Sequence, residues 1–254
     1  MTKVLRFCLF SLAVKLKEVN KIGWLIVVFL FSFNAFSAHD SDSLSVSKIE
    51  NWKISIEQKY ECLQDTTLSF EAYEEALRGY TLLKSEEKLP SSKYITIIDF
   101  SQHSYKKRLY IINVTDNVIV KRTFCAHGKR TGNELAKNFS NQEGSNMSSL
   151  GFYITEDTYS GKFDLALRLQ GLEASNNNAR SRGVVIHGAE YATEDFLMQN
   201  GRLGRSLGCP AIPLNEAPEI ISCIKDGSLV YIYHPTKSYR RQSLILRNYD
   251  FLEL

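Results

Sequence analysis

The stretch of sequence that decides the fold is YITIID at residues 94–99, followed by LYIINV at 109–114 and VIV at 118–120. These segments are rich in β-branched and aromatic residues, which is typical of strands. The turn Thr-Asp-Asn at 115–117 joins the second segment to the third and predicts a β-hairpin. GFYIT at 151–155 predicts a further strand of the same kind.

Two more strands and a few helices are predicted elsewhere in the sequence. GVVIH at 183–187 and LVYIY at 229–233 are short apolar runs. Large apolar residues recur at helical spacing between Phe70 and Tyr80 and predict an amphipathic helix. Thr193 and Asn215 can each cap a short helix. Because no βαβ alternation is present, the predicted fold class is mainly β with peripheral helices (α+β), with mostly antiparallel strands.

The N-terminus predicts an exported protein. Residues 1–38 carry five basic side chains and one acidic one, and an uncharged apolar run from Ile22 ends in small residues at Ala38. A basic flank, a short apolar run and a small-residue exit are typical of a signal peptide. An uncleaved N-terminal anchor is the alternative. Export implies an oxidising compartment, so Cys62, Cys125 and Cys223 permit one disulfide if Cys209 stays free.

Charge excludes some classes of partner. The formal net charge is +3, and the basic leader accounts for it, so the rest of the chain is close to neutral. A near-neutral domain predicts no nucleic-acid partner and no stable membrane partner after signal cleavage. The basic run 106–108 is interpreted as a solvated turn. The sequence does not predict an oligomeric state.

Cys209 is the strongest candidate for chemistry. It stands between Gly208 and Pro210, which permit a tight, outward-presenting turn. An acyl-transfer site needs such a nucleophile beside backbone N–H groups that can bind an oxyanion. A thiol also needs a base, and His187, at the end of a predicted strand, is the best placed of the five histidines.

Cys125 and His127 leave an alternative open. With His187 and Cys209 they could form a zinc site, although the spacing matches no familiar ligand pattern. The other interpretation of Cys125 is a buried small hydrophobe or half of a disulfide. The prediction is therefore no metal and no cofactor.

Residues 183–213 contain His187-Gly188 and Ser206-Leu207-Gly208-Cys209, and this pattern resembles the signature of the L,D-transpeptidases of the YkuD type. AHG at 126–128, NFSN at 138–141 and SSLGFY at 148–153 resemble the murein L,D-transpeptidase catalytic domain branch of that family. The resemblance spans roughly residues 94–234.

The resemblance implies a β-sandwich-like cysteine acyltransferase that acts on peptidoglycan stem peptides in the bacterial periplasm. By this analogy Cys209 attacks the stem tetrapeptide, releases D-Ala and passes the acyl group to a diaminopimelate amine, giving a 3→3 cross-link. His187 is the implied base, and a carbonyl near Gly188 holds its ring. The N–H groups of Gly208 and Cys209 are the implied oxyanion donors.

The sequence departs from the family pattern on both sides of the cysteine. Leu207 stands where histidine is usual, and Ala211 where arginine is usual. Carboxylate recognition must then come from elsewhere. The candidate substrate-binding residues are Arg205 and Arg202, which could also be ordinary surface arginines, together with Tyr153, His127 and Ser206. The Ser206 hydroxyl could instead orient the site or cap a turn.

The resemblance leaves two functional alternatives open. A hydrolase on the same acyl-enzyme would be an L,D-carboxypeptidase or a stem-to-lipoprotein amidase. An inactive wall-binding module would explain Leu207 but not the retained Cys209 and His187. The predicted domains are a signal peptide (1–38), an N-terminal helical extension (39–92) that packs on the catalytic domain or guards its cleft, the catalytic domain (93–236) and a C-terminal tail (237–254).

Overall fold

The computed structural model describes residues 46–91, 93–161 and 164–249. The predicted signal peptide lies outside these residues. The strands are β1 (Tyr94–Asp99), β2 (Leu109–Asn113), β3 (Val118–Thr123), β4 (Gly151–Gly161), β5 (Asp164–Gly171), β6 (Val185–Ala189), β7 (Ala211–Pro213) and β8 (Leu229–Tyr233).

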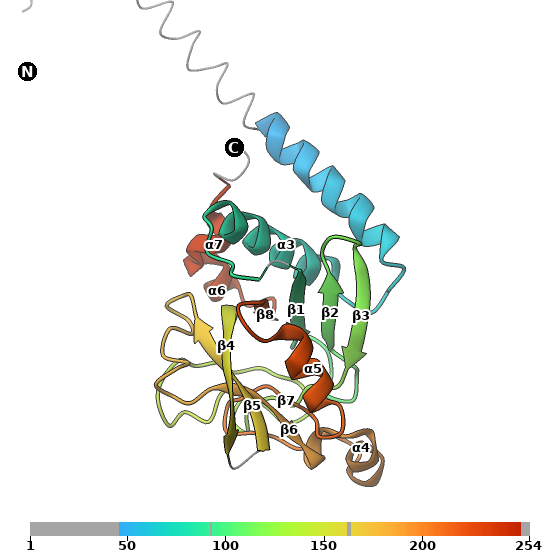
Figure 1. Cartoon of the computed structure of the whole chain (residues 1–254), viewed down its shortest axis with the longest axis vertical. Helices are drawn as coiled ribbons and strands as arrows, with labels where there is room; N and C mark the ends of the chain where they lie inside the picture. The colour runs from blue at the N-terminus through green and yellow to red at the C-terminus, as the bar shows by residue number, and fades with distance from the viewer. Residues whose placement is uncertain (1–45, 92, 162–163, 250–254) are drawn as a thin grey trace, which may run out of the picture. The chain divides into compact units, whose positions relative to one another are not determined.

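All eight strands belong to one sheet in the order β3-β2-β1-β8-β4-β5-β6-β7 (Figure 1). Five of the seven neighbouring pairs are antiparallel, and β1–β8 and β6–β7 are parallel. The predicted α+β class is confirmed, and the strands are mostly antiparallel as expected.

The helices lie around the sheet. They are α3 (Phe70–Ser85), the 3-10 helix η2 (Glu190–Ala192), α4 (Glu194–Asn200), α5 (Ala217–Ile224), α6 (Lys237–Gln242) and α7 (Leu244–Arg247). The predicted amphipathic helix is confirmed as α3, which begins where the Ser69 hydroxyl accepts the Ala72 N–H at 3.2 Å. Residues 46–62, within the predicted helical extension, are also helical. The residues from Trp52 onward belong to the same compact unit as the sheet.

The last strand in the sequence lies in the middle of the sheet. β8 pairs in parallel with β1, with Ile95 opposite Leu229, and antiparallel with β4, with Gly151 opposite Ile232. Every residue of β8 is buried. Such a strand is covered on both faces, which explains its continuous apolar sequence.

The apolar interior is divided into two clusters. The larger one joins α3 and α5 to the central strands and includes Tyr73, Phe152 and Tyr231. The smaller one consists of Phe124, Ala126, Ala189, Ala192, Leu203 and Ala211. The smaller cluster lies where β6 and β7 pair, which is the part of the sheet that carries the predicted nucleophile and base.

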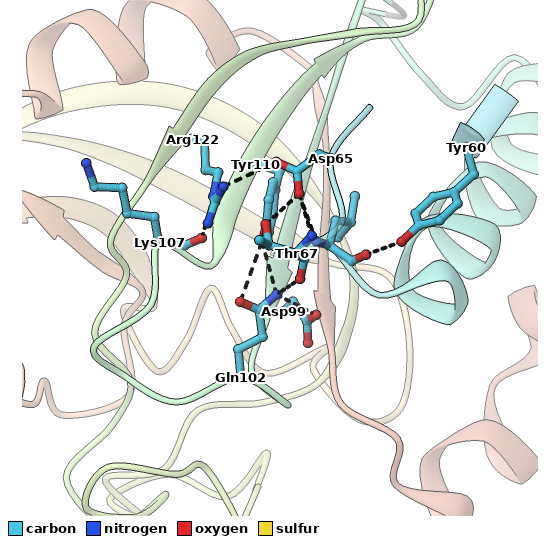
Figure 2. Close-up of polar contacts among 9 residues, drawn as sticks. Tyr60, Asp65, Thr67, Asp99, Gln102, Lys107, Tyr110 and Arg122 are labelled. Carbon is cyan, nitrogen blue, oxygen red and sulfur yellow. Dashed lines mark hydrogen bonds and ion pairs between the residues drawn. The ribbon is translucent and has the colours of Figure 1, made fainter. Parts of the chain in front are cut away.

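A polar network ties the segment before α3 to the sheet (Figure 2). Gln102 donates to the carbonyl oxygen of Thr67 at 2.8 Å and to the Tyr110 hydroxyl at 3.1 Å. Arg122 on β3 pairs with Asp65 at 3.3 Å. These bonds and the shared apolar cluster join the part of the predicted extension around α3 to the domain that follows it.

In the part of the chain that the structure describes, no helix is both long and apolar enough to cross a membrane.

Candidate active site

The predicted nucleophile lies in the Cys209 loop, which we define as residues 206–210, between α4 and β7. A single segment, residues 126–129, holds both ends of this loop. The Ser206 N–H donates to the His127 carbonyl at 3.0 Å, and the Lys129 N–H donates to the Ser206 carbonyl at 2.7 Å. At the other end, Ala126 and Ala211 exchange two backbone hydrogen bonds, of 2.7 and 3.2 Å. The loop is therefore bracketed by backbone that lies about 80 residues earlier in the chain.

Ser206 closes the loop from inside. Its hydroxyl donates to the Cys209 carbonyl at 2.6 Å and accepts the Gly208 N–H at 3.0 Å. The side chain is 5% exposed. Both of its hydrogen-bonding functions therefore serve the loop, in line with the alternative that it orients the site, and its role in substrate binding stays a prediction.

Gly208 is required by its conformation. Its φ is +133°, and an added Cβ would lie 2.9 Å from the Met147 carbonyl oxygen. Its carbonyl accepts the Ser148 hydroxyl at 3.1 Å. Because its N–H already donates to Ser206, that N–H does not point at an oxyanion site as the resemblance implied.

The Cys209 thiol is half-buried and lies next to the segment before β6. It donates to the Gly183 carbonyl, with sulfur and oxygen 3.7 Å apart. Burial raises the pKa of the thiol, while the Val185 N–H and the Arg182 guanidinium act to lower it. The net shift is upward, so the resting group is a neutral thiol at neutral pH.

His187 lies on β6 beside the strand that follows Cys209. It is opposite Ala211 in the β6–β7 register, and its N–H donates to the Pro210 carbonyl at 3.4 Å. Its ring Nδ1 lies 2.9 Å from the Gly188 carbonyl oxygen, so Nδ1 carries the proton. Burial lowers the pKa of His187, and the bond to Gly188 opposes this. The ring is therefore neutral at neutral pH, with Nε2 as its basic nitrogen.

Two predicted cleft residues are buried away from any cleft. Tyr153 is 0% exposed, and its hydroxyl bonds to the hydroxyl and carbonyl of Ser149 at 2.8 and 2.9 Å. His127 is 1% exposed, and its ring lies between the Arg108 guanidinium at 2.7 Å and the Gly132 carbonyl at 3.2 Å. Both side chains are thus buried among protein atoms, and a place for either in a substrate cleft stays a prediction.

The two candidate arginines lie on the approach to the loop and are half-exposed. Arg202 donates to the Leu203 carbonyl at 3.0 Å. Arg205 donates to the Asn133 side chain at 2.6 Å and more weakly to the carbonyls of Lys129 and Gly132. Those three residues also line a groove of about 390 Å³, to which Lys137 contributes. Substrate binding by Arg202 and Arg205 stays a prediction.

Sequence reasoning missed two arginines. Arg108 was interpreted as part of a solvated turn, but it is 0% exposed and donates to the carbonyls of Gln102 and Cys125 and to His127. Arg182 comes from a predicted polar loop and lies behind Gly208. Their partners are mostly backbone carbonyls from other loops, which leave no pattern in the sequence.

The zinc alternative has no ligand set in the described ranges, where no cluster of three or more His, Cys, Asp or Glu side chains could hold a metal ion. Cys125 is fully buried and its pKa is raised to about 12 by burial. All four cysteines in these ranges are free thiols.

Comparison with known protein families identifies the family of the chain. The sequence model of the L,D-transpeptidase catalytic domain matches residues 64–233. The chain belongs to the L,D-transpeptidase catalytic domain family.

Similar solved structures include an L,D-transpeptidase from Mycobacterium smegmatis at 10% identity and a TM-score of 0.37, where 56% of this chain covers 59% of the other. An L,D-transpeptidase from Mycobacterium tuberculosis is 18% identical with a TM-score of 0.34, covering 56% and 58%. One from Xylanimonas cellulosilytica is 14% identical with a TM-score of 0.32, covering 56% and 61%. This chain thus spans less than two thirds of the length of each. Among curated proteins, no sequence match was found.

Proposed function

We propose that this protein is a cysteine acyltransferase of the bacterial cell envelope, a peptidoglycan L,D-transpeptidase with Cys209 as its nucleophile. We propose that the exported protein acts in the periplasm on the stem peptides of the cell wall. The observation that carries the proposal is the β6–β7 pairing, which sets His187 beside the Cys209 loop while Gly188 orients its ring.

The first half of the reaction forms a thioester. Sγ of Cys209 attacks the carbonyl carbon between the L-centre of diaminopimelate and the terminal D-Ala, and Nε2 of His187 takes the thiol proton. A sulfur–carbon bond forms and the carbon–nitrogen bond breaks. The proton passes from His187 to the nitrogen of the leaving D-Ala.

The second half transfers the acyl group. The side-chain amine of diaminopimelate in another stem attacks the thioester carbon and gives a proton to His187. The new amide bond forms, the carbon–sulfur bond breaks, and the proton returns to the sulfur. The product is a 3→3 cross-link, and free Cys209 is regenerated.

Neutral resting groups suit this sequence of steps. The pKa of Cys209 is raised and that of His187 is lowered, so neither is charged before attack. Proton transfer is then coupled to bond formation. The Cys209 N–H is the loop donor that we assign to the oxyanion, because Ser206 engages the Gly208 N–H.

Substrate carboxylates are assigned to the basic groove beside the loop. Arg205 reaches three of the residues that line it, and the lining holds two basic residues, Lys129 and Lys137, against one acidic residue, Glu134, which lies beside His103. A guanidinium suits bidentate contact with a carboxylate. Arg202, which is half-exposed in the same segment, is the second candidate.

The test is muropeptide analysis after purified protein is added to tetrapeptide-rich sacculi. New 3→3 dimers are expected, and they should be absent with Cys209→Ala. Tripeptides without dimers would show that water, and not an amine, takes the acyl group from the thioester, so the protein would be a hydrolase. No difference between the wild-type protein and Cys209→Ala would leave a wall-binding module and contradict the proposal.

A further inference from the structure

Arg182 occupies an unusual place in the domain. Its guanidinium donates to the carbonyls of Ser140 at 2.9 Å and Met147 at 2.7 Å, and to the hydroxyls of Ser145 and Ser149 at 3.3 Å each. One side chain thus holds both ends of the loop formed by residues 140–149.

That loop lies directly against the Cys209 loop. The Met147 carbonyl and an Arg182 nitrogen would lie 2.9 and 3.3 Å from a Cβ at Gly208. The Ser148 hydroxyl donates to the Gly208 carbonyl at 3.1 Å and accepts the Gly128 N–H at 3.0 Å. Arg182, which is half-buried, therefore supports the residue before the nucleophile through the 140–149 loop.

Its guanidinium forms no ion pair with a carboxylate in the described ranges. All four of its acceptors are neutral oxygens, so the hydrogen bonds fix the cation without neutralising it. A fixed, uncompensated cation close to a sulfur favours the charged form of that sulfur.

The other ionisable groups near Cys209 cannot supply that charge. His187 on β6 is neutral because burial lowers its pKa. Tyr191 on η2 feels the charge of Cys209, and burial raises its pKa to about 12, so it is a neutral phenol. Arg182 is the cation that acts on the Cys209 sulfur.

We propose that Arg182 is a positioning residue that fixes the loop behind Gly208 and, through its uncompensated charge, favours the thiolate of Cys209. This inference rests on the proposed function for the role of Cys209 as nucleophile, but its test needs no wall substrate.

The experiment measures the rate at which iodoacetamide alkylates Cys209 across pH 7–11.5 in the full chain, with each cysteine resolved by peptide mass. Alkylation proceeds through the thiolate, so its pH midpoint reports the pKa of the thiol. For Arg182→Gln we expect the midpoint to rise by about one unit, with about tenfold slower alkylation at neutral pH. The rate at high pH should be equal or faster, because a more basic thiolate is more nucleophilic.

Three variants separate charge from packing. Arg182→Lys keeps the charge but not the fork of donors, so it should loosen the 140–149 loop and keep the midpoint close to that of the wild type. Arg182→Met gives a second neutral side chain in case Arg182→Gln does not fold. Arg180→Gln is the matched control, because Arg180 is exposed and paired with Glu156 and Asp157.

A midpoint that stays at the wild-type value in a folded neutral variant overturns the proposal. Equal midpoint shifts in Arg182→Lys and Arg182→Gln would also overturn it, because they would show a packing effect alone. If the midpoint shifts as expected while sacculi show no new muropeptides, the proposed function fails and the role of Arg182 stands.

Discussion

The domain contains two cysteine–histidine pairs, and they differ in nearly every physical respect. Cys125 and His127 are fully buried on the segment that brackets the Cys209 loop, and the His127 ring is bonded at both nitrogens. Cys209 is half-buried on a tight loop, and His187 lies on β6 opposite Ala211, two residues after the cysteine. The same residue types thus serve as scaffold in one place and as candidate chemistry in the other.

The difference teaches that accessibility and backbone setting decide the role, not residue identity. Burial raises the pKa of Cys125 to about 12 and lowers that of His127 to about 3, so both are locked in their neutral forms. At the other pair the shifts are smaller and the sulfur reaches the surface. Four predictions address this contrast, in order of decreasing effect.

The largest expected effect is on thiol labelling in the native protein. Cys209 should react with iodoacetamide at least about 1,000-fold faster than Cys125, because Cys125 becomes accessible only when the core opens. Peptide mass mapping at pH 8 measures both rates. In urea the two should react at similar rates, and comparable labelling in the folded state would remove the contrast.

The second prediction concerns the base. His187→Ala should reduce D-Ala release by about 100-fold or more, the usual scale of general base catalysis. Because the pKa of His187 is lowered from 6.5, the wild-type rate should fall only as pH drops below 6.5. The dependence of kcat/KM on pH measures both effects. A fall in rate that begins above pH 6.5, or that persists in His187→Ala, would assign the base elsewhere.

The third prediction concerns stability. His127 has a folded-state pKa of about 3, lowered by burial and by Arg108, whereas the unfolded chain binds a proton near pH 6.5. Stability is therefore lost as pH falls from 6.5 towards 3, by about 1.4 kcal/mol for each pH unit from this group. Urea unfolding at pH 7 and pH 5 measures the loss.

In His127→Gln this part of the pH dependence should disappear, although the variant is less stable at every pH. His103→Gln is the matched control, since His103 lies near the surface beside Glu134. An unchanged slope in His127→Gln would show that the buried ring does not control acid stability.

The smallest expected effect is at Leu207, the position where the family resemblance led us to expect histidine. Its side chain is 71% exposed and projects away from the loop interior. Leu207→His should therefore change the alkylation rate of Cys209 by less than about threefold, because an exposed imidazole is well solvated. A larger change would mean that this position faces the sulfur.

Much of the fold was predictable because several strands have a residue composition that is typical of strands. The segments at β1, β2 and β8 are apolar and β-branched, and all three were expected. β5 was missed because Leu165–Gln170 favours a helix as much as a strand, and its pairing with β4 and β6 decides the outcome. β7 has only three residues and is defined by its neighbours.

In the candidate site, the residues that could be predicted were those whose backbone setting is visible in the sequence. Gly208 and Pro210 mark an unusual turn, and His187 ends an apolar run, so both stood out. Arg108 and Arg182 did not stand out, because the sequence does not distinguish a buried arginine from an exposed one. Their carbonyl acceptors come together only in the tertiary structure. The same limit explains why His127 and Tyr153 were placed in a cleft.

The central position of β8 has a consequence for how the chain reaches its native state. In the strand order of the sheet, this strand joins the half-sheet β3-β2-β1, which α3 covers, to the half-sheet β4-β5-β6-β7, whose last strand follows the Cys209 loop. It is the last of the eight to be synthesised, and its pairing with β1 closes a loop of more than 100 residues, a kind of contact that forms slowly. In a chain truncated before Leu229, the edges of β1 and β4 that pair with β8 would be unpaired. The sheet can therefore be completed only after the last strand has been synthesised.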